Sequence, residues 1–179
     1  MSNKLFVFIE GNDDELFLKR ILVPLFSRKN IIPWKYSSKK KEKVISFIES
    51  INAMGANYIF ITDFDERDCL ETRITEILSV FKNLDKNSIV IVKNEIESWY
   101  ISGINNELEV ENPCTKRLRK ISIPENTEKI TKEEFMKLMP VSFNGSKIDF
   151  MQEIIKYYDR ILAQNRNNSF KCFINDFVK

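Results

Sequence analysis

Residues 5–14 decide the fold, and they read LFVFIEGNDD. The first five are all apolar and rich in aromatic and β-branched side chains, which predicts a strand buried on both faces, as in a parallel sheet. The strand ends at Glu10. Asn12 then predicts the start of a helix, because Glu15 follows three residues later and completes a capping box. Residues 58–65, YIFITDFD, repeat the pattern of a buried strand that ends in acids.

Outward from these two stretches, strands and amphipathic helices alternate over residues 4 to about 103. Two further apolar runs predict strands, and Pro33 places the first of them at a sheet edge, because proline lacks the N–H that a central strand needs. The predicted elements are strands at residues 31–36 and 89–92 and helices at residues 41–54 and 70–81. This alternation predicts an α/β fold with a parallel sheet of about four strands flanked by helices.

The pattern changes after Gly103. Residues 105–130 are polar and show weak periodicity, and they are followed by helices that begin near Thr131, Ser146 and Asn168. The chain has 179 residues, which is close to one ordinary domain. We therefore expect residues 1–104 to form the α/β catalytic core and residues 105–179 to form a helical extension packed on the same domain.

The composition excludes several classes of function. Lys and Arg number 28 and Asp and Glu number 26, so the net charge of +2 excludes a polycation that binds nucleic acid by bulk charge. The absence of histidine excludes Ser-His-Asp and Cys-His catalysis and metal sites built on imidazole. With 4 glycines the chain contains neither a Walker loop nor a dinucleotide-binding fingerprint. An active site must therefore use carboxylates, Lys, Arg, Ser, Thr or Tyr.

The cysteines and the apolar runs predict the compartment. The 3 cysteines are far apart and odd in number, which favours a reducing interior over a disulfide framework. The apolar run near the N-terminus is too short for the core of a signal peptide, and no run approaches the length of a membrane span. We expect a cytoplasmic protein with no membrane partner.

Acids follow each of the three buried strands. Glu10 follows the first, Asp63 and Asp65 follow the second, and Glu97 lies just after the third. Because the carboxyl ends of parallel strands share one edge of a sheet, these acids are expected to converge, with Asp14 in the next helical turn. Grouped carboxylates repel one another unless a cation is present, and Mg²⁺ or Mn²⁺ suits hard oxygen ligands. Singly, each acid also fits a helix cap.

These motifs resemble the TOPRIM domain, the catalytic module of topoisomerases, bacterial primases and OLD-family nucleases. Its first motif, a strand followed by Glu, Gly and then Asp, is matched by residues 6–14, where Glu10, Gly11 and Asp14 follow the strand. Its second, a strand that ends in Asp-x-Asp, is matched by Asp63 and Asp65. The resemblance implies that Glu10 is the general acid or base, that Asp63 and Asp65 bind Mg²⁺ or Mn²⁺, and that Asp14 is a supporting metal-site acid.

The segment NEIESW at residues 94–99 looks like the Glu-x-Trp element of small standalone TOPRIM-like proteins, which makes Glu97 a further candidate metal ligand. The chain has no room for the additional domains of a topoisomerase or a replicative primase. The ATPase domain that OLD proteins usually carry would have to come from a separate chain, and the oligomeric state stays open. The resemblance thus implies a metal-dependent nuclease that acts on nucleic acid, with DNA favoured over RNA.

Basic side chains could hold a polyanionic substrate beside the acids. Lys147 is a candidate for stabilising charge in the transition state. The candidates for phosphate binding are Lys39, Lys40, Lys41 and Lys43 in one run and Lys116, Arg117 and Arg119 in another. A solvated surface explains each run equally well. Tyr36 and Trp34 could stack bases, although packing in the sheet is the favoured interpretation.

Two other hypotheses fit part of the pattern. One is a TOPRIM-like subunit that binds nucleic acid without catalysis. The other is a receiver-like signalling module, in which Asp13 and Asp14 form an acid pair, Asp63 accepts a phosphoryl group and Lys93 supports it. The receiver hypothesis assigns no task to Glu10.

Overall fold

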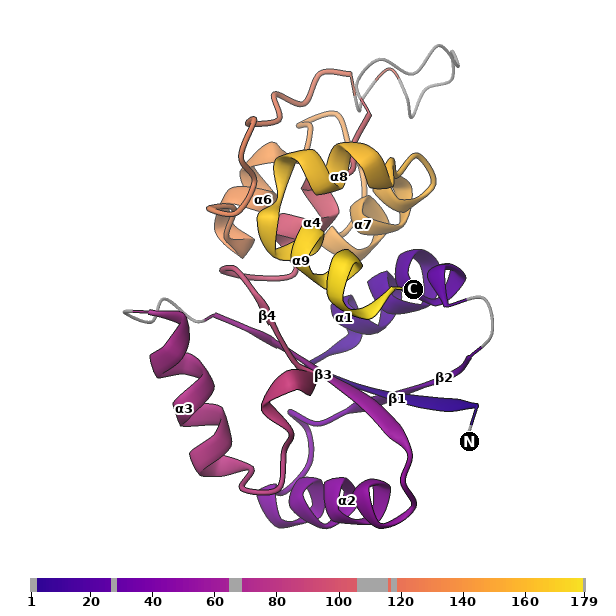
Figure 1. The fold of residues 1–179 in the computed structure, drawn as a ribbon. Helices are drawn as coiled ribbons and strands as arrows, with labels where there is room; N and C mark the ends of the chain where they lie inside the picture. Colours follow the sequence, from indigo (N-terminus) through magenta and orange to yellow (C-terminus); the bar gives the residue numbers. More distant parts are fainter. Residues whose placement is uncertain (1–2, 27–28, 65–68, 106–115, 117–118, 179) are drawn as a thin grey trace. The chain divides into compact units, whose positions relative to one another are not determined.

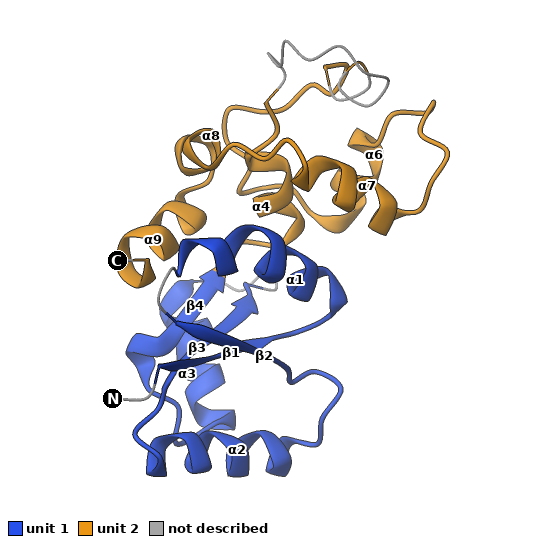
Figure 2. Cartoon of the chain, turned by 90° about the vertical axis from the view of Figure 1, so that its right-hand side faces the viewer, with its two compact units in different colours: residues 1–91 blue, residues 92–179 orange. Residues whose placement is uncertain are grey.

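The structure is a computed structural model that describes residues 3–26, 29–64, 69–105, 116 and 119–178. It divides the chain into two compact units, residues 1–91 and residues 92–179 (Figure 2). The division falls earlier in the chain than residue 104, so the segment that contains Glu97 belongs to the second unit. The packing of residues 105–179 on the same domain stays a prediction.

The sheet has four strands in the order β2-β1-β3-β4. The strands are β1 (Lys4–Ile9), β2 (Asn30–Lys35), β3 (Asn57–Asp63) and β4 (Ile89–Val92). β1 pairs in parallel with both β2 and β3, which confirms the predicted α/β fold with a parallel sheet. Pro33 lies opposite Val7 in β2, at an edge of the sheet, as predicted from its missing N–H.

Helices cover both faces of this sheet. α2 and α3 lie on one face and α1 lies on the other (Figure 1). The helices are α1 (Asn12–Phe17), α2 (Lys41–Ala53) and α3 (Leu70–Val80). A π-helix (Leu18–Leu22) and a 3-10 turn (Val23–Leu25) continue α1, and a second 3-10 turn (Lys86–Ser88) precedes β4. The core under α2 and α3 contains Phe6, Phe8, Tyr58 and Phe60 from alternate positions of β1 and β3. This alternation is what a strand with side chains on two faces requires.

The start of α1 differs from the expectation. The N-cap is Gly11, and its N–H donates to Oδ2 of Asp14 at 3.0 Å. The predicted capping box of Asn12 and Glu15 is wrong, because both side chains accept hydrogen bonds from Nζ of Lys35 on β2, at 3.0 and 2.8 Å. A cation from a neighbouring strand thus binds the polar groups that the local sequence assigns to the cap.

The second unit is helical in the part that the structure describes. Its helices are α4 (Glu97–Ser102), α6 (Lys132–Leu138), α7 (Lys147–Ile155), α8 (Arg160–Arg166) and α9 (Asn168–Phe177). Capping boxes at Thr131 and Ser146 begin α6 and α7 as predicted, with Glu134 and Asp149 as the reciprocal partners. The core includes Trp99, Phe135, Phe150, Phe170 and Phe173. None of the described helices is long and apolar enough to cross a lipid bilayer.

Candidate active site at the carboxyl end of the sheet

The register of β1 with β2 and β3 places Glu10 between two polar side chains. In the ladder, Ile9 pairs with Lys35 of β2, and Phe8 pairs with Phe60 of β3. One step further along β1, the same register sets Glu10 beside Tyr36 on one side and Thr62 on the other. The N–H of Tyr36 donates to the carbonyl of Ile9 at 3.0 Å, so the ladder continues to this point.

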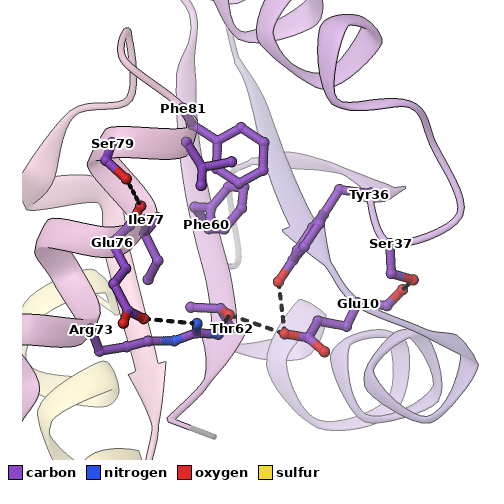
Figure 3. A pocket seen from close by; sticks show the side chains of 11 residues that line it. Glu10, Tyr36, Ser37, Phe60, Thr62, Arg73, Glu76, Ile77, Ser79 and Phe81 are labelled. Carbon is purple, nitrogen blue, oxygen red and sulfur yellow. Dashed lines mark hydrogen bonds and ion pairs between the residues drawn. The ribbon is translucent and has the colours of Figure 1, made fainter. Parts of the chain in front are cut away.

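One oxygen of the Glu10 carboxylate is held by three donors. Oε1 accepts hydrogen bonds from the Tyr36 hydroxyl at 2.8 Å and the Thr62 hydroxyl at 3.0 Å (Figure 3). It also accepts one from the backbone N–H of Asp63 at 3.3 Å. Oε2 accepts no hydrogen bond from any residue that the structure describes. The carboxylate is therefore oriented through Oε1 and can offer Oε2 to a ligand, a metal ion or a proton.

Arg73 of α3 binds two of the groups that surround Glu10, the Thr62 hydroxyl and the end of β3. Its Nη2 donates to the Thr62 hydroxyl at 3.1 Å, and its Nε donates to the carbonyl of Asp63 at 3.0 Å. Since the Thr62 oxygen accepts from Arg73, its own proton is directed to Glu10. Arg73 thus fixes both the hydroxyl and the end of β3. Its carboxylate neighbour Glu76 lies 3.8 Å away.

Tyr36 keeps its proton at this site. Burial raises the pKa of the Tyr36 hydroxyl well above its ordinary value, and the negative charges of Glu10 and Asp14 raise it further, while a hydrogen bond with Thr62 acts in the opposite direction. The hydroxyl therefore stays a hydrogen-bond donor to Glu10 at neutral pH.

The predicted acids are brought together in part. Asp14 is buried in the first turn of α1, and Asp63 lies at the end of β3 with its N–H on Glu10. Asp65 lies outside the described residues. Within the described residues, no group of three or more acids is close enough to hold a metal ion. The structure thus brings the backbone of Asp63 to Glu10 and leaves the carboxylates of Glu10, Asp14 and Asp63 short of a three-acid group.

Glu97 and Lys147 meet in the second unit. Lys147 forms an ion pair with Glu97, and the two side chains are 16% and 5% exposed. Nearby, burial raises the pKa of Glu95, a hydrogen bond from the Lys132 N–H acts against this, and the charge of Glu97 raises it again. Lys147 is therefore the counterion of Glu97. Lys93, the lysine of the receiver hypothesis, lies 3.5 Å from Glu128 in the same unit.

The predicted phosphate-binding residues lie on the surface. Lys39, Lys40, Lys41 and Lys43 are exposed where the chain enters α2. Lys116 and Arg119 are exposed in the second unit, and Arg117 lies outside the described residues.

Beside Glu10 the first unit contains a cavity of about 450 Å³. It lies between the sheet and α3, and its wall combines aromatic and aliphatic side chains with polar and charged ones (Figure 3). Its lining includes Glu10, Tyr36, Phe60, Arg73, Glu76 and Phe81.

Sequence reasoning missed Thr62 and Arg73 and gave Tyr36 only a stacking role. One signal for Arg73 was present: it stands four residues before Ile77, which is buried, so it continues the inward face of α3 towards the strand ends. A cation on the buried face of a helix calls for a partner, and here the partners are at the end of β3.

Comparison with known proteins gives matches in structure alone. No family model matches the sequence, and no curated protein matches it. The chain is similar to the C-terminal region of the OLD protein of Xanthomonas campestris pv. campestris, with 13% identity, a TM-score of 0.47 and coverage of 98% of this chain and 97% of the other. It is also similar to the C-terminal region of the Burkholderia pseudomallei OLD protein, with 15% identity, a TM-score of 0.46 and full coverage of both chains.

Proposed function

We propose that the chain is a metal-dependent nuclease that hydrolyses phosphodiester bonds in nucleic acid, with DNA preferred over RNA. The observation that carries the proposal is the geometry of Glu10. Three donors fix one carboxylate oxygen, and no described residue donates to the other. A carboxylate held in this way at the carboxyl end of a parallel sheet is suited to bind an ion or to transfer a proton.

The donor chemistry fits Mg²⁺ or Mn²⁺. Asp63 has a carboxylate oxygen, Oδ1, that is buried at the end of β3. In the proposal Asp63 and Asp65 hold the ion and Asp14 supports them, while Oε2 of Glu10 is kept for proton transfer. When bound, such an ion would stabilise the negative charge that develops on the attacked phosphate.

The residues of the chain itself have separate tasks in this proposal. Glu10 takes the proton of the attacking water or delivers one to the leaving oxygen through Oε2. Tyr36 and Thr62 hold Oε1, so that Oε2 keeps one direction, and Arg73 holds Thr62. The exposed lysines from Lys39 to Lys43 bind backbone phosphates.

The proposal is tested by incubating the purified chain with single-stranded and double-stranded DNA and RNA, with Mg²⁺, with Mn²⁺ and with EDTA. We expect cleavage only with a divalent ion. Glu10→Gln keeps the shape of the side chain but cannot take up a proton, so the rate should fall by about 10²–10⁴-fold. Glu71→Gln, an exposed glutamate at the start of α3, is the matched control and should cleave like the unmodified chain.

Wild-type cleavage by Glu10→Gln would reject the assignment of Glu10. Salt-sensitive binding of nucleic acid without cleavage under either metal ion would instead support the subunit that binds without catalysis.

A further inference from the structure

The cavity beside Glu10 has no task in the proposed hydrolysis, although its volume of about 450 Å³ is that of a small-molecule site. We infer that it holds one unstacked nucleobase of the substrate strand. The inference rests on the proposed function for the choice of nucleic acid, and it adds that the substrate must present a base outside a duplex stack.

Aromatic rings make a wall that suits a flat heterocycle. The rings of Tyr36 and Phe60 are stacked, with centroids 4.6 Å apart and planes 25° apart. Phe81 adjoins them, with its centroid 5.3 Å from that of Phe60 and 6.4 Å from that of Tyr36. Ile77 and Val80 of α3 complete the apolar lining. Phe60 is only 1% exposed and is covered by Tyr36, so a base would stack on the half-buried rings of Tyr36 and Phe81, whatever its identity, because each base has a π face.

The charged groups in the lining select a base over a phosphate. Glu10 and Glu76 bring two carboxylates, and Arg73 brings one guanidinium that is already bonded to Thr62 and Asp63. Because both oxygens of Glu10 already have tasks, Glu76 is the carboxylate that can accept hydrogen bonds from the exocyclic amino groups and ring N–H groups of bases. The excess of negative charge repels a phosphate that would enter the cavity.

Basic side chains near the cavity can bind the phosphate backbone of the nucleic-acid strand whose base enters it. Ser37 lines the cavity, and the N–H of Lys39 donates to the carbonyl of Tyr36 at 2.9 Å. The run of exposed lysines therefore starts within one turn of the cavity wall. A nucleotide can place its base against Tyr36 while its phosphate lies outside, near Lys39 and Lys40.

The first experiment measures the binding of adenosine, guanosine, cytidine and thymidine to the full chain by saturation-transfer NMR, in EDTA so that neither metal nor cleavage is needed. We expect saturable transfer to base protons. Val80→Trp fills the cavity from the end of α3 and should abolish the transfer. Thr75→Trp is the matched control, because Thr75 is exposed on the same helix and does not line the cavity.

The second experiment separates base from phosphate. Inorganic phosphate should not displace a nucleoside from the cavity, whereas a short single strand should bind more tightly than the nucleoside and lose affinity as salt rises. Lys40→Ala should weaken the single strand and leave nucleoside binding unchanged. Lys86→Ala removes an exposed lysine that precedes β4, at the opposite edge of the sheet, and should change neither.

The inference is overturned if no nucleoside gives transfer, or if Val80→Trp keeps the transfer with an intact circular-dichroism spectrum. Should Val80→Trp fail to fold, Ser79→Trp fills the same cavity from an exposed lining position and decides the question in its place. Nucleoside binding without any cleavage would retain the base site and reject the nuclease. Cleavage without nucleoside binding would retain the nuclease and reject the base site.

Discussion

The register of β1 with β2 and β3 determines which side chains surround Glu10. Phe8, two residues earlier on the same face of β1, lies between Trp34 and Phe60, with ring centroids 5.2 and 5.6 Å away. The next residue on that face is Glu10, and its neighbours are the next ones on the adjacent strands, Tyr36 and Thr62. Because side chains alternate along a strand, a slip of one residue would turn Glu10 to the opposite face. The core that fixes the register therefore also positions the site.

Thr62 offers a test of the site that needs no activity. Its hydroxyl is buried, donates to Glu10 and accepts from Arg73. Thr62→Val removes both hydrogen bonds and leaves the Arg73 guanidinium short of an acceptor. We expect the free energy of unfolding, measured with urea, to fall by about 1–3 kcal/mol.

The control for this test is Thr62→Ser, which keeps the hydroxyl and loses one methyl group. It should retain most of the stability that Thr62→Val loses. If the two variants unfold at the same urea concentration, the hydrogen bonds from Arg73 through Thr62 to Glu10 do not stabilise the strand edge.

At the scale of the elements, local signals were sufficient for most of the fold. The apolar runs predicted all four strands, and Pro33 predicted the edge strand. The caps at Thr131 and Ser146 depend only on residues three positions away, and they were predicted correctly. The cap of α1 was predicted wrongly, because Lys35 of β2 binds the side chain of Asn12. No local pattern contains that contact.

The same distinction explains what could be predicted of the site. Glu10, Asp14 and Asp63 could be named as candidates because each stands at the end of an apolar run or in the helical turn that follows one. Thr62 and Arg73 were missed, because their roles depend on which residues lie opposite one another in the ladder and on where α3 packs. A single sequence indicates the ends of strands but not the register between them.

The cap of α9 supports a prediction at this scale. Asn167 is fully buried, and its Oδ1 accepts from the Phe170 N–H at 2.9 Å and from the Ser169 hydroxyl at 2.8 Å. Its Nδ2 donates to the hydroxyls of Ser98 and Thr127. Asn167→Ala loses the cap and leaves buried polar groups without partners, so it should cost about 2–4 kcal/mol of unfolding free energy.

Ser146→Ala is the comparison for this prediction, because Ser146 caps α7 of the same unit at an exposed position. Water can replace the lost hydroxyl there, so we expect a loss of about 1 kcal/mol. Both losses are measured by urea unfolding followed by circular dichroism. Equal losses would mean that the buried contacts of Asn167 add nothing to its capping bond.

For the molecule as a whole, the absence of histidine shapes how stability depends on pH. No side chain in the sequence has an ordinary pKa near 6.5, so no group of that kind titrates between the carboxylates and the thiols. Stability should therefore be nearly constant between about pH 6 and pH 8.

Above that range, three tyrosines predict a fall in stability. Burial raises the pKa of Tyr36, Tyr58 and Tyr158 above the ordinary value of 10.0. At a pH above about 10 the unfolded chain loses these protons while the folded chain keeps them, so unfolding is favoured increasingly as the pH rises from the unfolded towards the folded pKa. Urea midpoints measured from pH 8 upward should fall beyond about pH 10. Tyr36→Phe should make this fall less steep whatever it does to stability at pH 8, because it removes one of the protons that separate the two states. An unchanged slope in Tyr36→Phe would contradict a buried, protonated hydroxyl at Glu10.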